Sequence, residues 1–209
     1  MSEKTEFTLR EEMVRAGRLL LESGLTNGAA GNMSLSLGDG SYIVTPTGSS
    51  LGHLCAEELS RVNAKGELLS GPKPTKEVPF HIALYEVNPT VKAIVHLHSS
   101  FATAYASLEG LDATNAIRPM TPYCVMRLGE VALLPYRKPG SVLIAEDLRK
   151  VGANRKAFLL ANHGLIVGGK NMTDAVNNAF ELEESCKLYF ITKGLPVRYL
   201  TENDVAELT

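Results

Sequence analysis

The chain has no tryptophan, only three cysteines and no excess of charge of either sign. Cys55, Cys124 and Cys186 lie far apart and form no C-x-x-C pair, so neither a disulfide framework nor a thiolate zinc site is indicated. The net charge is -2 and the basic residues form no stripe, which argues against nucleic acid or an anionic membrane as partner. No apolar run approaches the roughly 20 residues that span a bilayer. Because the first stretch, MSEKTEFTLREEM, is also too charged for a signal peptide, we expect a cytoplasmic protein.

What is present is an alternation of helical and strand patterns without repeats or linkers, which predicts one α/β domain over residues 1–209. We expect a first helix that starts at a Thr8–Glu11 capping box and ends near Gly24. A half-buried strand with Met33, Leu35 and Leu37 inward should follow, then a turn at Asp39-Gly40 and a returning strand. The remaining expected elements are a helix over 80–87, a strand over 93–98, helices over 101–108 and 141–151, two short strands joined at 162–164, and a closing helix capped by Thr173 that stops at Gly194. The segment RPMTPYC gives no clear pattern.

The segment AIVHLHSS places two of the five histidines one residue apart in an apolar strand pattern. Residues two apart on a strand project to the same face, so His96 and His98 should lie side by side with Ile94. Two charged imidazoles would repel each other, whereas two neutral rings can share one metal ion. The alternative is a pair of ordinary core histidines, and for His53 and His81 we expect only surface or packing roles.

A distant histidine, His163, stands beside Gly164, where the missing side chain lets a ligand or another backbone approach. Three protein nitrogens with an open position are typical of a catalytic zinc site. Glu77 lies at an expected helix start, where it either compensates the helix dipole or serves the site.

Three segments could bind an anion such as phosphate, because they combine glycines with short hydroxyl and amide side chains. They are GAAGN (28–32), TPTGSS (45–50) and the Thr75-Lys76 pair. Each could equally be an ordinary turn, and none is a dinucleotide fingerprint or a P-loop.

In order along the chain, GNMS, TPTG, PTKE, HLHS and NHG resemble the class II aldolase/adducin family, from about residue 8 to residue 194. Within it, TPTGSSLG and PTKE are most similar to the branch of 3-oxo-tetronate 4-phosphate decarboxylases, because the L-fuculose-1-phosphate aldolases tend to have two serines before the glutamate.

The resemblance implies a divalent metal, usually zinc, with manganese or cobalt as alternatives, bound by His96, His98 and His163. Glu77 matches the family's catalytic acid/base, which can also bind the metal at rest. The implied phosphate-binding residues are Gly31, Asn32, Thr47, Gly48, Thr75 and Lys76. Tyr123 and Tyr136 are candidates for the tyrosine proton donor that a neighbouring subunit supplies in the aldolases.

The resemblance further implies a three-layer α/β fold, with a central, mainly antiparallel sheet flanked by helices, and a homotetramer with active sites at subunit interfaces. The implied reaction is decarboxylation of a 3-oxo-tetronate 4-phosphate to dihydroxyacetone phosphate and carbon dioxide. A sugar-phosphate aldolase or epimerase shares the same site residues. A non-enzymatic, adducin-like interaction module is a third possibility, although all three histidines and Glu77 are present.

Overall fold

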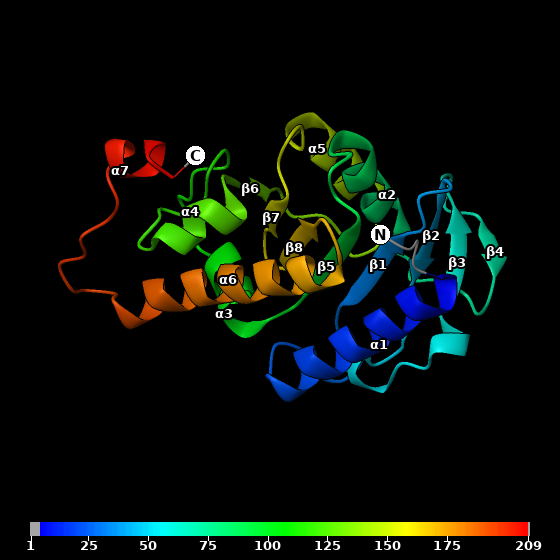
Figure 1. Ribbon diagram of the computed structural model, residues 1–209. Helices are drawn as coiled ribbons and strands as arrows, with labels where there is room; N and C mark the ends of the chain where they lie inside the picture. The colour runs from blue at the N-terminus through cyan, green and yellow to red at the C-terminus, as the bar shows by residue number, and fades with distance from the viewer. Residues whose placement is uncertain (1–4, 209) are drawn as a thin grey trace.

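A computed structural model describes residues 5–208, which form three layers with one mixed sheet in the middle (Figure 1). The strands are β1 (Asn32–Ser36), β2 (Ser41–Val44), β3 (Ser60–Asn63), β4 (Leu68–Ser70), β5 (Ala93–Leu97), β6 (Val131–Leu134), β7 (Ala157–Leu160) and β8 (Gly164–Gly169). Their order across the sheet is β4-β3-β2-β1-β5-β8-β7-β6. Within the described chain every pairing is antiparallel except that of β6 with β7, which confirms the expected mainly antiparallel sheet.

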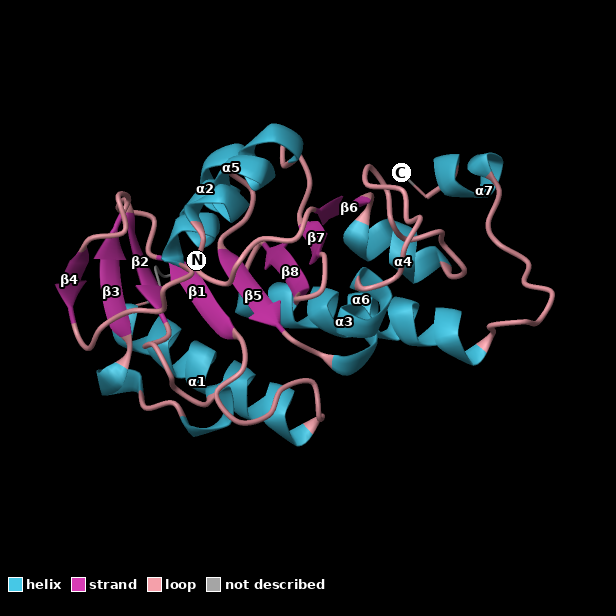
Figure 2. Ribbon diagram, turned by 180° about the vertical axis from the view of Figure 1, so that it is seen from behind, coloured by secondary structure: helices cyan, strands magenta, loops and turns pink. Residues whose placement is uncertain are grey.

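Helices cover both faces of this sheet, as Figure 2 shows from behind. They are α1 (Glu6–Glu22), α2 (Val78–Val87), α3 (Ser100–Ala106), α4 (Pro122–Leu128), α5 (Val142–Val151), α6 (Met172–Ile191) and α7 (Glu202–Ala206), with two short 3₁₀ turns at Leu51–His53 and Ala56–Glu58. One apolar core joins α1, α3 and α6 to the sheet, and a second core on the opposite face joins α2 and α5. Among the described residues no helix is both long and apolar enough to cross a membrane.

Strand β5 is the centre of the sheet and is buried on both sides. Ala93, Val95 and Leu97 belong to the α1/α3/α6 core, whereas Ile94 belongs to the α2/α5 core. His96 shares the side of Ile94 and packs edge-on against Phe80 of α2, with ring centroids 5.2 Å apart. The predicted separation of the two faces of this strand is therefore confirmed.

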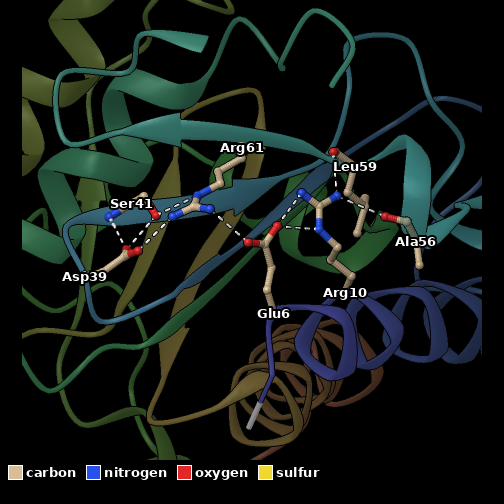
Figure 3. A network of polar contacts seen from close by, with 7 residues as sticks. All are labelled: Glu6, Arg10, Asp39, Ser41, Ala56, Leu59 and Arg61. Atoms are coloured by element: carbon tan, nitrogen blue, oxygen red, sulfur yellow. Dashed lines mark hydrogen bonds and ion pairs between the residues drawn. The ribbon is translucent and has the colours of Figure 1, made fainter. Parts of the chain in front are cut away.

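Charged groups fasten α1 to the edge of the sheet (Figure 3). Arg10 donates to the carbonyl oxygens of Ala56 and Leu59 at 3.0 and 2.7 Å, so the guanidinium satisfies two backbone acceptors. Glu6 accepts from Arg10 and also pairs with Arg61 of β3 at 3.0 Å. These bonds fix the position of the first helix relative to β3, on the same side of the sheet as α6.

Several element boundaries were predicted wrongly. The N-cap of α1 is Thr5, whose hydroxyl accepts from the Thr8 amide, so Thr8 lies inside the helix and does not begin a capping box. The N-cap of α6 is Asn171 in place of Thr173, because the Asn171 side chain accepts from the Asp174 amide at 2.9 Å.

The sequence patterns also failed to predict several elements. The segment RPMTPYC leads into α4, and strands β3, β4 and β6 were not foreseen. Strand β4 is exposed along its whole length, so it carries no alternation of apolar and polar residues. Strand β1 is not half-buried: Ser34 is fully buried beneath α2.

Candidate metal centre

The histidines come together because the end of β5 lies beside the turn between β7 and β8. Leu97 pairs with Leu165, so His98, just after β5, faces His163, just before β8. A Cβ at Gly164 would lie 2.2 Å from the Leu97 carbonyl oxygen. Only glycine permits this close approach of the two strands, which explains the glycine beside the third histidine.

Glu77 comes from the start of α2, and its carboxylate lies in the same cluster as the three histidines. The backbone there is held by an isolated bridge between Pro46 and Pro74 and by a 3.0 Å hydrogen bond from the Thr75 amide to the Thr45 carbonyl. The Glu77 amide donates to the Thr75 hydroxyl at 3.3 Å. Glu77 occupies the N-cap position of α2, but its carboxylate points away from the helix amides and toward the histidines.

The four side chains form a compact donor set. His98 Nε2 lies 3.0 Å from both His96 Nε2 and His163 Nε2. The Glu77 carboxylate oxygens lie 3.3 Å from His96 Nε2 and 3.7 Å from His163 Nε2. Neighbouring ligands of a tetrahedral ion with bonds of 2.0–2.1 Å are separated by about 3.3 Å. The donor set therefore fits a metal ion in both composition and spacing.

Electrostatics favours neutral rings around one carboxylate. Burial lowers the pKa of His96 to about 3, and it also lowers the pKa values of His98 and His163. Burial alone would raise the pKa of Glu77, but favourable polar contacts, among them the hydrogen bond from the Asn32 amide, outweigh it, so this pKa is below its ordinary value. At neutral pH the set has three imidazole lone pairs and one negative charge, as a divalent cation requires.

Hydrogen bonds to the backbone and to a side-chain amide orient two of these groups. His96 Nδ1 donates to the Leu165 carbonyl at 2.7 Å, which leaves its Nε2 lone pair directed at the other rings. Asn32 Nδ2 donates to Glu77 Oε2 at 2.7 Å. The other oxygen, Glu77 Oε1, is buried without a hydrogen-bond partner, so it is free to take a metal ion or a proton.

Two of the predicted phosphate segments lie side by side. The Thr75 amide donates to the Thr45 carbonyl and the Thr47 amide donates to the Lys73 carbonyl, both at 3.0 Å, so the TPTG segment runs beside PTKE and the lysine before it. Gly48 has a φ of +74° and open space around its Cα, which lets its backbone face solvent. Lys76 is exposed and close enough to lower the pKa of His98.

Gly31 and Asn32 have closer ties to the metal centre itself. A Cβ at Gly31 would lie 2.6 Å from the His96 carbonyl oxygen, so the glycine lets β1 approach β5. The Asn32 side chain is buried and engaged with Glu77 and His81. Contacts of these two residues with phosphate stay predictions.

The two candidate tyrosines lie outside the four-residue cluster, and both are 60% exposed. Tyr123 is on α4 and lines a surface hollow of about 450 Å³ together with Met126, Arg127 and Asn178. Tyr136 follows β6. Their exposure suits a residue that acts on another subunit, and that role stays a prediction.

The sequence did not predict the hydrogen bonds of His81. A surface or packing role was expected for this residue; it is buried, and it is also hydrogen-bonded to both Asn32 and Ser34. The missed signal is the spacing of Glu77, His81 and Tyr85, which are four residues apart and so share one face of α2.

This fold and donor set define a metal-dependent class II aldolase type of domain, and comparison with known proteins agrees. The family described as "Class II Aldolase and Adducin N-terminal domain" matches residues 11–190, and the chain belongs to this family. The chain is 54% identical over 205 residues to a 3-oxo-tetronate 4-phosphate decarboxylase of Escherichia coli strain K12, covering 98% of this chain and 97% of the relative. It is 32% identical over 184 residues to an L-fuculose phosphate aldolase of Methanococcus maripaludis, covering 88% and 97%.

Solved structures show the same architecture. YgbL from Klebsiella pneumoniae superposes with a TM-score of 0.96 at 51% identity, covering 99% of this chain and all of the other. An L-fuculose 1-phosphate aldolase superposes with a TM-score of 0.86 at 25% identity, covering 100% and 97%. The predicted family and the predicted three-layer fold are both confirmed.

Proposed function

We propose that this protein is a metal-dependent lyase that decarboxylates a 3-oxo-tetronate 4-phosphate to dihydroxyacetone phosphate and carbon dioxide. The observation that carries the proposal is the convergence of three neutral imidazole nitrogens and one buried carboxylate. The choice of substrate is supported by four relatives of 51–55% identity that bear the name of this decarboxylase.

The residues of the centre have distinct roles in this reaction. His96, His98 and His163 would hold the metal, with Glu77 as a further ligand at rest. When bound, the ion acts as a Lewis acid that polarises the substrate carbonyl. When the carboxylate leaves as carbon dioxide, the bonding electron pair stays on the neighbouring carbon, which must then take up one proton. Glu77 Oε1 is buried and free of hydrogen bonds, which supports a role for it in carrying that proton, directly or through a water molecule.

The phosphate group of the substrate would bind at the adjoining segments. Gly31, Asn32, Thr47, Gly48, Thr75 and Lys76 form the proposed site. The pairing of Thr47 with Lys73 brings two of these segments together, and Lys76 adds a positive charge. The enzyme would work in the cytoplasm as a homotetramer, with Tyr123 or Tyr136 reaching a neighbouring active site.

The deciding experiment generates the unstable 3-oxo acid in situ from a phosphorylated tetronate with a dehydrogenase. We expect equal amounts of carbon dioxide and dihydroxyacetone phosphate. If the protein released no carbon dioxide but cleaved or epimerised fuculose or ribulose phosphates efficiently, it would be an aldolase or epimerase. If it lacked bound metal and were inert toward all these substrates, an adducin-like interaction module would be favoured.

Zinc is the proposed metal, because nitrogen donors and a four-ligand spacing near 3.3 Å suit it; manganese and cobalt are the alternatives. Elemental analysis should find about one zinc per chain in the purified protein. His98→Ala should retain much less, because it removes the ring that lies 3.0 Å from both other histidines. Equal zinc content in the two proteins would remove His98 from the site.

A further inference from the structure

A chain of buried polar groups runs from the metal centre into the space between β1 and α2. Asn32 Nδ2 lies 2.7 Å from Glu77 Oε2, and Asn32 Oδ1 lies 2.6 Å from His81 Nε2. His81 Nδ1 lies 2.7 Å from the Ser34 hydroxyl, which lies 2.8 Å from the Tyr85 hydroxyl. All five residues are at most 7% exposed, so water does not compete for these bonds.

This row of hydrogen-bonded side chains forms because the spacing of residues two apart on β1 is close to the spacing of residues four apart on α2. Asn32 and Ser34 are two apart on β1, which separates them by about 6.6 Å. Glu77, His81 and Tyr85 are four apart along one face of α2, which separates successive residues by about 6.0 Å. The two rows therefore interleave, and His81 lies between Asn32 and Ser34.

The ionised carboxylate of Glu77, at one end of the row, determines which atom donates in each hydrogen bond. An ionised Glu77 only accepts hydrogen bonds, so Asn32 must turn its nitrogen toward Glu77 and its oxygen toward His81. His81 must then donate from Nε2 and, as a neutral ring, accept at Nδ1. Ser34 therefore donates to His81 and accepts from Tyr85.

His81 supports this orientation of the Asn32 amide from the end opposite Glu77. The two ends of a carboxamide have nearly the same shape, so only their hydrogen-bond partners distinguish them. The Nε2–H of His81 can donate only to the oxygen end of the amide, which leaves the nitrogen end to donate to Glu77 Oε2. With Oε2 occupied in this way, Oε1 is the oxygen that stays available for a metal or a proton.

We propose that His81 is a positioning residue of the metal centre, which acts through Asn32 to orient the Glu77 carboxylate. This role rests on the proposed function, because it assumes that Glu77 binds the metal and handles a proton. Ser34 and Tyr85 complete the row of hydrogen bonds on the other side of the His81 ring and hold the ring in place.

The test compares His81→Phe, which keeps a ring but removes both hydrogen bonds, with His81→Gln, whose amide can still donate to Asn32. Partners that orient metal ligands typically contribute 10- to 100-fold to metal affinity or activity. We expect His81→Phe to lower kcat about tenfold with KM for the phosphorylated substrate nearly unchanged, and His81→Gln to restore most of the loss.

Tyr105→Phe is the matched control, because it removes a buried hydroxyl that donates to the Ala116 carbonyl, on the opposite face of the sheet. Thermal unfolding of all variants separates lost stability from lost orientation. If Tyr105→Phe lowered kcat as much as His81→Phe, or if His81→Gln failed to restore it, the positioning role would be wrong.

Zinc affinity, measured by competition with a chelator, keeps the test independent of the reaction. If the wild type binds zinc without decarboxylating anything, weaker binding in His81→Phe and its recovery in His81→Gln would support the positioning role while the proposed function fails. Should His81→Phe not fold, Ser34→Ala replaces it and should weaken zinc binding several-fold. Unchanged affinity in the variant that folds overturns the proposal.

Discussion

At the scale of single residues, Glu77 combines deep burial with close contacts to several polar groups. Its carboxylate is 5% exposed, touches two imidazoles and accepts from one amide, yet one oxygen stays without a hydrogen bond. A buried acceptor without a partner costs stability, typically about 1–3 kcal/mol. Such a cost is expected where a side chain must be ready for a metal or a proton.

Glu77→Gln should keep the shape of the centre but remove its acid/base group. We expect kcat for decarboxylation to fall by roughly 10²- to 10⁴-fold, the usual contribution of general acid/base catalysis. Steady-state kinetics and zinc content are measured on the same sample, since some metal is lost if Glu77 is a ligand. A zinc-loaded variant with wild-type kcat would exclude Glu77 as the proton carrier.

Lys76→Ala tests the phosphate site. An exposed lysine beside the metal centre should bind a phosphate oxygen, and a hydrogen bond to a charged group contributes about 1.5–3 kcal/mol. We expect KM for the phosphorylated substrate to rise about tenfold or more with a smaller change in kcat. Lys92→Ala, at the opposite end of β5 from His96, is the control and should change neither constant. An unchanged KM in Lys76→Ala would make this lysine an ordinary solvated residue.

At the scale of elements, α6 supports the loop that carries His98. Glu183 of α6 accepts hydrogen bonds from the Ser99 hydroxyl at 2.6 Å and from the amides of Phe101 and Ala102 at 2.9 and 2.8 Å. A carboxylate at the first turn of α3 satisfies amides that the helix itself leaves unpaired. The turn just after His98 is therefore held by a long helix on the other side of the sheet.

Glu183→Gln should destabilise this junction, because one carboxylate oxygen becomes an amide nitrogen that faces hydrogen-bond donors. We expect the free energy of unfolding to fall by about 1–3 kcal/mol, with weaker zinc binding. Chemical denaturation and chelator competition measure the two effects. Glu184→Gln, the exposed neighbour, should stay within about 0.5 kcal/mol of the wild type. Equal stability of the two variants would show that the buried carboxylate contributes nothing specific.

The arrangement of the elements also explains which features of the site and fold could be predicted from the sequence. The paired histidines were found because a strand repeat of two is unambiguous, and Glu77 was found because its motif is shared with a family. His81 was missed because its partners Asn32 and Ser34 come from another element about 50 residues away, and only the packing of α2 on β1 shows that the rows interleave. Strand β4 was missed because it is exposed, so burial imposes no pattern on its residues.

At the scale of the whole molecule, the metal centre joins the two halves of the sheet. Glu77 and Asn32 come from the part formed by β1 to β4 and α2, whereas His163 comes from the hairpin of β7 and β8. Strand β5 lies between β1 and β8 and contributes His96. A bound ion would therefore link segments far apart in sequence, and its removal should affect the stability of the entire domain.

The pH dependence of stability in the metal-free protein follows from the buried imidazoles. Burial lowers the pKa of His81 to about 4 and that of His96 to about 3, from an ordinary value near 6.5. As the pH falls below about 6.5, the unfolded chain takes up protons that the folded chain excludes, so stability decreases down to about pH 4. Each of these rings should contribute on the order of 3 kcal/mol over that window, at about 1.4 kcal/mol per pKa unit.

Denaturant unfolding of chelator-treated protein at pH 4.5, 5.5, 6.5 and 7.5 measures this slope. The free energy of unfolding should be nearly constant above pH 6.5 and should fall steadily below it, because carboxyl groups with lowered pKa values, such as Asp147, act mainly at still lower pH. His81→Gln should flatten the slope by about the share of one ring. A wild-type stability that does not vary between pH 4.5 and 6.5 would contradict the neutral, buried state of these histidines, on which the metal-binding geometry depends.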